Sequence, residues 1–127
     1  MRGLEFHSSF QPQGCKFTID TTAVTVAAGE PFGDIYTKAA TLNQTVVGPT
    51  PATVGIGGYL TGGGHSPLSA LYGLGSDQVL ELNVVTASGE QLTVNECQNT
   101  DLFWALRGVS VFANQPSIST TLPFLIQ

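Results

Sequence analysis

Six glycines lie within ten positions of this 127-residue chain, between Gly55 and Gly64. Glycine has no Cβ and adopts backbone conformations closed to other residues, but ordering it on folding costs entropy. Large apolar residues such as Ile56 and Leu60 are interleaved with these glycines, whereas flexible linkers are usually rich in Gly and Ser alone. The run is therefore either a surface turn or a segment whose backbone N–H groups meet a ligand, such as phosphate oxygens or the polar edge of a planar cofactor.

Two common nucleotide-binding motifs do not fit this run. A Walker A loop would continue with Gly-Lys-Ser/Thr, but His65 follows Gly64. A Rossmann fingerprint would need a third glycine at the position of Leu60, and no acidic residue follows before Asp77. The glycines therefore indicate close backbone approach without identifying the ligand.

Charged residues make up only 10% of the chain, well below the roughly 25% of a typical soluble domain. No residue from Ala39 to Ser76 carries a formal charge, yet Gly, Pro, Thr and Asn interrupt every apolar run before it reaches about 18 residues, so we expect no membrane span. So little charge suggests that part of the surface is normally covered. The net charge of −5 and the lack of a basic patch argue against a nucleic-acid partner.

Two cysteines, Cys15 and Cys97, lack the spacing of metal ligands, and we expect no metal site. They either pair as a disulfide in a secreted protein or stay as buried thiols. Asn43-Gln44-Thr45 is an N-glycosylation acceptor triplet. The N-terminal residues lack the apolar region of a signal peptide, so the sequence leaves the cellular location open.

Hydrophobic periodicity predicts helices over Pro31–Leu42 and Asn99–Arg107. In the first, Phe32, Ile35, Ala39 and Leu42 share one face; in the second, Asn99 is expected to cap the helix. Tyr72 and Trp104 are expected in the core. Strands are expected around 24–26, 45–47, 80–84 and 92–94, the last two joined by a turn at Ser88-Gly89. This order of elements predicts an α+β fold with a mostly antiparallel sheet and flanking helices.

The residues around the glycine run resemble a known family. The stretch Ala52–Gly64, continued by Ser66-Pro-Leu-Ser69 and Tyr72-Gly-Leu74, is similar to the PCMH-type FAD-binding domain of FAD-linked oxidoreductases. The similarity is to the berberine-bridge-enzyme-like branch of the vanillyl-alcohol-oxidase superfamily, and fungal secreted members look closest. It extends upstream and downstream, from about Leu4 to Gly108, through Ala23–Gly29, Thr45–Gly48, Asp77–Gly89 and Asn99–Gly108.

The resemblance implies that residues 1–108 form the second lobe of such a domain and that the backbone around the glycines contacts FAD. Tyr59 stands where the family places His or Tyr beside the flavin, although ordinary core packing is the alternative. His65 is either a supporting polar group or a plain loop residue. No catalytic residue is assigned, because no carboxylate or activated Tyr lies near the run. The cofactor-binding residues implied are Thr53, Val54, Gly55, Gly57, Gly58, Tyr59 and Gly62.

Compared with the family, the sequence looks like a fragment. The first lobe, with its pyrophosphate loop and frequent flavin-linked histidine, has no counterpart here, and His7 does not match it. Pro51 stands where some members carry a second flavin-linked residue, a cysteine. Residues 109–127 are unlike the family, and we expect a divergent, poorly ordered tail without the family's re-entrant strand.

Two functional hypotheses follow from the resemblance. In the first, the chain is part of a flavin-dependent oxidoreductase that passes hydride from an unidentified small organic substrate to FAD, which O2 reoxidises. By itself the chain is then expected to be inactive and to bind FAD weakly or not at all. In the second, it is a non-catalytic scaffold remnant or the product of an incorrect gene model. The sequence identifies neither the substrate nor the oligomeric state.

Overall fold

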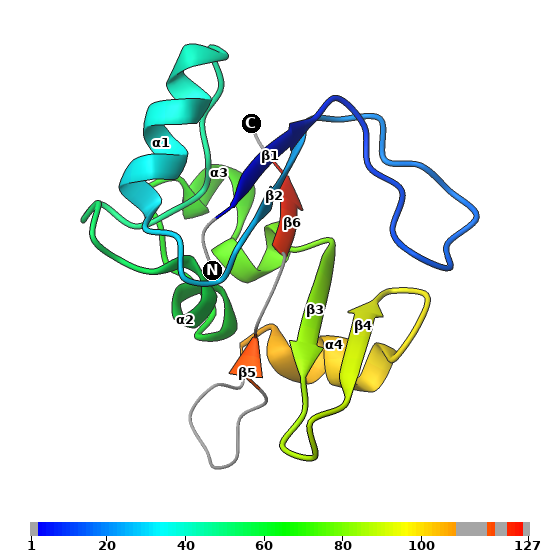
Figure 1. The fold of residues 1–127 in the computed structure, drawn as a ribbon. Coiled ribbons are helices and arrows are strands. Elements are labelled where there is room, and N and C mark those ends of the chain that lie inside the picture. Colours follow the sequence, from blue (N-terminus) through cyan, green and yellow to red (C-terminus); the bar gives the residue numbers. More distant parts are fainter. Residues whose placement is uncertain (1–2, 109–116, 119–121, 126–127) are drawn as a thin grey trace.

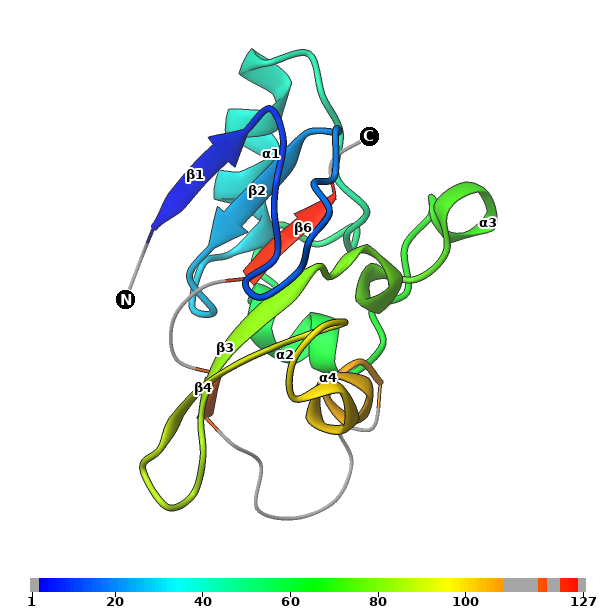
Figure 2. The same cartoon turned by 90° about the vertical axis from the view of Figure 1, so that its right-hand side faces the viewer.

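Within the residues that the structure describes, the fold contains two small antiparallel sheets and four short α-helices (Figures 1 and 2). The computed structural model describes residues 3–108, 117–118 and 122–125, the last two stretches as backbone only. One sheet has the strand order β1-β2-β6 and the other β4-β3-β5, and every strand pair is antiparallel. The predicted α+β class with mostly antiparallel pairing is confirmed.

The first sheet packs with helix α1 around the main core. Strand β1 (Leu4–His7) pairs with β2 (Ala23–Val26), and β2 pairs on its other side with β6 (Leu122–Leu125). Helix α1 (Phe32–Thr41) begins after Pro31 and turns its apolar face inward, burying Phe32, Ile35 and Ala39. The predicted helix is confirmed, except that Leu42 lies just past its last turn and is 46% exposed.

The second sheet is the predicted hairpin with one added strand. Strand β3 (Glu81–Val85) pairs with β4 (Gln91–Asn95), and the turn between them uses Gly89 at φ 84°. Helix α4 (Thr100–Leu106) packs on β4 and buries Phe103. The residue before it, Asn99, does not cap the helix with its side chain. It adopts φ 51° and its Nδ2 donates back to the Thr93 carbonyl at 2.8 Å.

One strand prediction was wrong. Residues 45–47 form no strand, although Val46 and Val47 are buried. Strand β6 pairs with β2, and β5 (Ser117–Ile118) pairs with β3. That residues 109–127 form a divergent tail without the family's re-entrant strand stays a prediction, although six of them lie in these two strands. Pro123 lies in β6 at the sheet edge, where a missing N–H is tolerated. The other tail residues lie outside the described part of the chain.

The two aromatic residues expected in the core are exposed. Trp104 follows the buried Phe103 on α4 and therefore points away from β4, with 71% of its surface exposed. Tyr72 ends the four-residue helix α3 (Ser69–Tyr72), which buries none of its residues. Both predictions failed because local pattern does not tell which face of a short helix meets the core.

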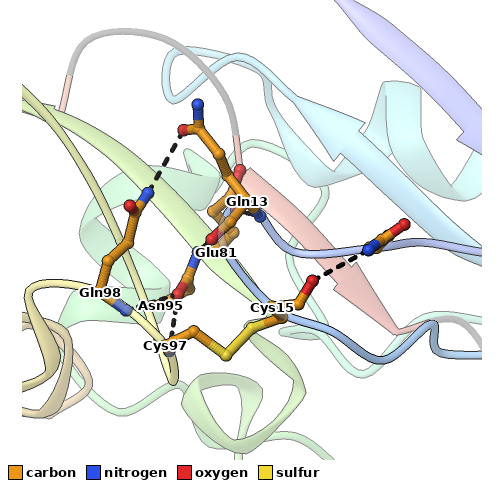
Figure 3. The surroundings of a disulfide bond; sticks show 7 residues. Gln13, Cys15, Glu81, Asn95, Cys97 and Gln98 are labelled. Atoms are coloured by element: carbon orange, nitrogen blue, oxygen red, sulfur yellow. Dashed lines mark hydrogen bonds between the residues drawn. A yellow bond between two sulfur atoms is a disulfide. The ribbon is translucent and has the colours of Figure 1, made fainter.

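Cys15 and Cys97 form a disulfide, which decides between the two alternatives left by the sequence (Figure 3). Their Cα atoms are 5.4 Å apart although 82 positions separate them. The carboxylate of Glu81, which is buried, accepts hydrogen bonds from the Gln13 N–H at 2.7 Å and from Asn95 Nδ2 at 2.9 Å. The bond and this polar cluster therefore join the segment before β2 to the β3–β4 hairpin.

Replacing both cysteines (Cys15→Ser with Cys97→Ser) is expected to lower the free energy of unfolding by about 2–5 kcal/mol, because the cross-link closes a long loop in the unfolded chain. Urea denaturation of the variant and of the oxidised wild type measures the difference. Reductant should destabilise the wild type similarly and leave the variant unchanged. An unchanged midpoint in the variant would contradict the expectation.

Candidate functional site

The start of the glycine run is held by backbone pairing with residues 28–33. The two segments run antiparallel, with a bridge between Pro31 and Gly55. Four backbone hydrogen bonds join them: Ile56 N–H to the Glu30 carbonyl at 3.1 Å, Gly57 N–H to Ala28 at 3.1 Å, Phe32 N–H to Val54 at 3.0 Å and Gly33 N–H to Ala52 at 2.8 Å. The pairing fixes the segment against the start of α1.

Part of the run is a helix, α2 (Ile56–Thr61), so its glycines have different surroundings. A Cβ on Gly57 would lie 3.0 Å from the Ala28 carbonyl oxygen and 3.1 Å from the Ala28 Cβ. A Cβ on Gly55 or Gly58 would meet no atom within 4 Å. Gly57 is therefore needed for packing inside the fold, whereas Gly55 and Gly58 leave the outer surface open.

The open surface also carries unused hydrogen-bond donors. Within the described residues, the backbone N–H groups of Thr53, Gly55 and Gly58 donate to no acceptor. All three residues are exposed. N–H groups in the first turn of a helix have no partner within it, so α2 presents its start outward. This surface suits an oxygen-rich or planar polar ligand that comes close to the backbone.

Tyr59, in the middle of the glycine run, packs against the end of the run and against α1. Its hydroxyl donates to the His65 carbonyl at 2.6 Å, and its ring meets Phe32 edge-on with centroids 4.9 Å apart. A Cβ on Gly64, whose φ is 76°, would lie 2.7 Å from this ring. The tyrosine thus has a packing role, and burial raises its pKa to about 12. The side chain of His65 is exposed, and its carbonyl accepts the hydrogen bond from Tyr59.

The two other residues implied by the resemblance are placed differently. Val54 is half-buried against the core, and its carbonyl accepts a hydrogen bond from the Phe32 N–H at 3.0 Å. Gly62 is exposed at the C-terminal end of α2, and its N–H donates to the Gly58 carbonyl at 3.1 Å. Contact of either residue with a cofactor stays a prediction.

One residue beside the site was not anticipated from the sequence. Glu30 pairs with Ile56 through its carbonyl, and its side chain is buried with 7% exposed. Its Oε2 finds no hydrogen-bond donor among the described residues. A charged residue just before the proline that starts a helix is usually solvent-exposed, so nothing in the local sequence predicted that Glu30 is buried.

Beyond the glycine run, residues 69–74 expose three large apolar side chains, those of Leu71, Tyr72 and Leu74. Exposed apolar side chains gathered in this way are typical of surfaces that contact a ligand or another part of a protein.

In the described part of the chain, no three His, Cys, Asp or Glu residues are placed to share a metal ion. None of its helices has the length and hydrophobicity needed to cross a bilayer.

Comparison with known families shows which family this chain belongs to. A family model described as an FAD binding domain matches residues 13–95, about two thirds of the chain and including Thr53–Gly62. This chain belongs to that FAD-binding family. The resemblance found on the sequence motifs is therefore confirmed.

Curated relatives agree with this assignment. An FAD-linked oxidoreductase from Aspergillus flavipes, ffsJ, is 49% identical over 85% of this chain but only 18% of its own length. Aurantioclavine synthase cnsA from Penicillium expansum is 42% identical over 96% of this chain and 29% of its own. The match therefore spans only 18% to 29% of the length of these relatives.

A solved structure shares the fold. The VAO-type flavoprotein MtVAO615 from Myceliophthora thermophila matches 99% of this chain with a TM-score of 0.85 and 32% identity. The match covers 22% of that flavoprotein. The expected similarity to vanillyl-alcohol-oxidase flavoproteins thus holds for the fold as well as for the sequence.

Two neighbouring substitutions in α2 should act in opposite directions. Gly57→Ala is expected to lower the free energy of unfolding by about 1–3 kcal/mol, since its Cβ presses on Ala28. Gly58→Ala should raise it by up to about 1 kcal/mol, because alanine favours helix and the space is open. Urea denaturation of both variants checks this. Equal effects would mean that the two glycines do not differ in packing.

Stability should fall at alkaline pH. Burial raises the pKa of Tyr59 and, with added repulsion from Tyr59, that of Tyr36 to about 12, against about 10 in an unfolded chain. Between these values the unfolded chain releases protons that the folded chain keeps, so the free energy of unfolding decreases as pH rises. Urea titrations at about pH 9 and 11 test this. Tyr59→Phe should show a smaller decrease, and an equal one would exclude Tyr59 as a source.

Proposed function

We propose that this chain forms one wall of an FAD site in a flavin-dependent oxidoreductase. The wall consists of the exposed backbone at Thr53, Gly55 and Gly58, with Val54 and Tyr59 behind it and Gly62 at its far end. Membership of the FAD-binding family indicates that the cofactor is FAD. The open space over Gly55 and Gly58 supports the proposed position of the cofactor on this surface.

The chemistry of the surface fits FAD. FAD offers diphosphate oxygens and the carbonyl oxygens of its ring, which accept hydrogen bonds from backbone N–H groups. The free N–H groups of Thr53, Gly55 and Gly58 are such donors, and no Cβ stands in front of the two glycines. The carboxylate of Glu30 lies beside this backbone, and its buried Oε2 has no hydrogen-bond donor among the described residues.

Each residue then has a defined task in the site. When bound, FAD would supply the hydride acceptor for oxidation of an organic substrate, with O2 as the final oxidant. The chain's own contribution is to hold the N–H donors in place before binding, since Gly57 fits tightly against Ala28. Burial raises the pKa of Tyr59 to about 12, so its hydroxyl stays protonated near neutral pH. This hydroxyl donates to the His65 carbonyl and thereby holds the loop after α2 in place.

The proposal is tested best in a complete flavoprotein, because the chain matches only 22% of MtVAO615. We expect a chimera carrying this chain in place of the matching segment to retain FAD through gel filtration. Gly58→Leu in the chimera should weaken FAD binding by about tenfold or more, which corresponds to about 1.4 kcal/mol of lost contact. Flavin absorbance per protein and FAD titration measure this.

Ala40→Leu is the matched control, since Ala40 is also an exposed helical position but lies on α1. It should leave flavin binding unchanged. A folded chimera that binds FAD equally well with Gly58→Leu would contradict the proposed wall. A folded chimera without any flavin would favour the alternative of a non-catalytic scaffold.

A further inference from the structure

We propose that Asn43 is a site of N-linked glycosylation. Asn43-Gln44-Thr45 is the single Asn-x-Ser/Thr triplet in the 127 residues. The family assignment does not use it, and the proposal does not rest on the proposed function. Such triplets occur by chance, so the inference depends on where the fold places this one.

The triplet lies on the surface, directly after α1. The Asn43 N–H donates to the Ala40 carbonyl at 3.1 Å and the Gln44 N–H donates to Ala39 at 3.0 Å, which ends the helix. Asn43 accordingly adopts φ 56°, a left-handed conformation that asparagine tolerates at this position. Residues 44–49 continue without a regular element. The acceptor is thus in an irregular segment, where a modifying enzyme can reach it.

Both residues that the modification requires are accessible. Asn43 and Thr45 are exposed, and within the described residues neither side chain makes a hydrogen bond. Next to them the surface has a hollow of about 280 Å³, lined by Phe6, His7, Ser8, Thr22, Leu42 and Gln44. The neighbours of Asn43 in sequence, Leu42 and Gln44, form part of that hollow. There is therefore room for a sugar beside the asparagine.

The disulfide is the independent observation that points to the right compartment. N-glycans are added in the secretory pathway, where conditions are oxidising, and structural disulfides form there as well. Cys15 and Cys97 are bonded in the folded chain, and among the described residues no cysteine is free. A chain that contains this disulfide and carries an exposed acceptor triplet fits the conditions of that pathway.

A glycan at Asn43 would not obstruct the glycine surface. Gly55 pairs with Pro31 at the start of α1, whereas Asn43 lies past its end. A helix of 10 residues is about 15 Å long, so the two sites are at opposite ends of α1 (Figure 1). The modification and the open surface over Gly55 and Gly58 are compatible in one molecule.

The chemistry requires a lipid-diphosphate-linked oligosaccharide as donor and a membrane-bound oligosaccharide transferase. The Asn43 side-chain nitrogen forms a bond to C1 of the first sugar while the bond from C1 to the diphosphate oxygen breaks. The lipid diphosphate leaves, and the nitrogen gives one proton to a base of the transferase. No oxidant or reductant takes part.

The test is secretion of the full chain from a yeast host behind a cleavable leader, with secreted and cell-retained protein both analysed. We expect peptide N-glycosidase to increase the gel mobility of the wild type, and mass spectrometry to find aspartate at position 43 afterwards. Thr45→Ser should keep the shift because serine also completes the triplet. Thr45→Ala and Asn43→Gln should abolish it.

Thr45→Ala guards against a folding artefact, because Thr45 is exposed and has no left-handed backbone requirement. Disulfide formation, measured by thiol labelling, confirms that each variant is folded. Disulfide-bonded wild type without any glycan at Asn43 would overturn the proposal. A mobility shift that persists in Thr45→Ala would overturn it as well, since the sugar would then be elsewhere.

Discussion

The antiparallel backbone pairing between residues 28–33 and 52–57 is the interaction on which the glycine surface depends. It uses the N–H groups of Ile56 and Gly57 and thereby leaves those of Gly55 and Gly58 to face outward. Without a side chain on Gly57, Ala28 comes close enough for this pairing. The donors are therefore positioned by the fold before a ligand arrives, which lowers the entropy that binding has to overcome.

A second constraint joins parts of the chain that are distant in sequence. The Cys15–Cys97 disulfide and the buried Glu81 hold the segment before β2 against the hairpin (Figure 3). The hairpin also contacts β6 through β3, so the two small sheets support one another. Both sheets contribute to one buried cluster, which includes Val24 and Val26 of β2 and Leu82 and Val84 of β3.

Much of the fold could be predicted from local pattern. Helix α1, the β3–β4 hairpin and α4 follow from the spacing of apolar residues, because each buries one face along a single element. Residues 45–47 have the apolar character of a strand but form none, whereas β6 from the far end of the chain pairs with β2. Trp104 is as apolar as Phe103, yet only one of two adjacent helical residues can face β4. Which segment enters a sheet and which side chain faces the core depend on the whole fold, so the local sequence did not predict them.

The sequence by itself determined the family and the cofactor class, because its motifs from about Leu4 to Gly108 resemble those of the family in their order. Only the tertiary structure decided which glycines serve the fold and which leave a surface open. Gly57 and Gly58 are adjacent and chemically identical, but one faces Ala28 and the other faces no atom within 4 Å. What a missing Cβ accomplishes depends on its neighbours in space, and those are set by backbone pairing between distant segments.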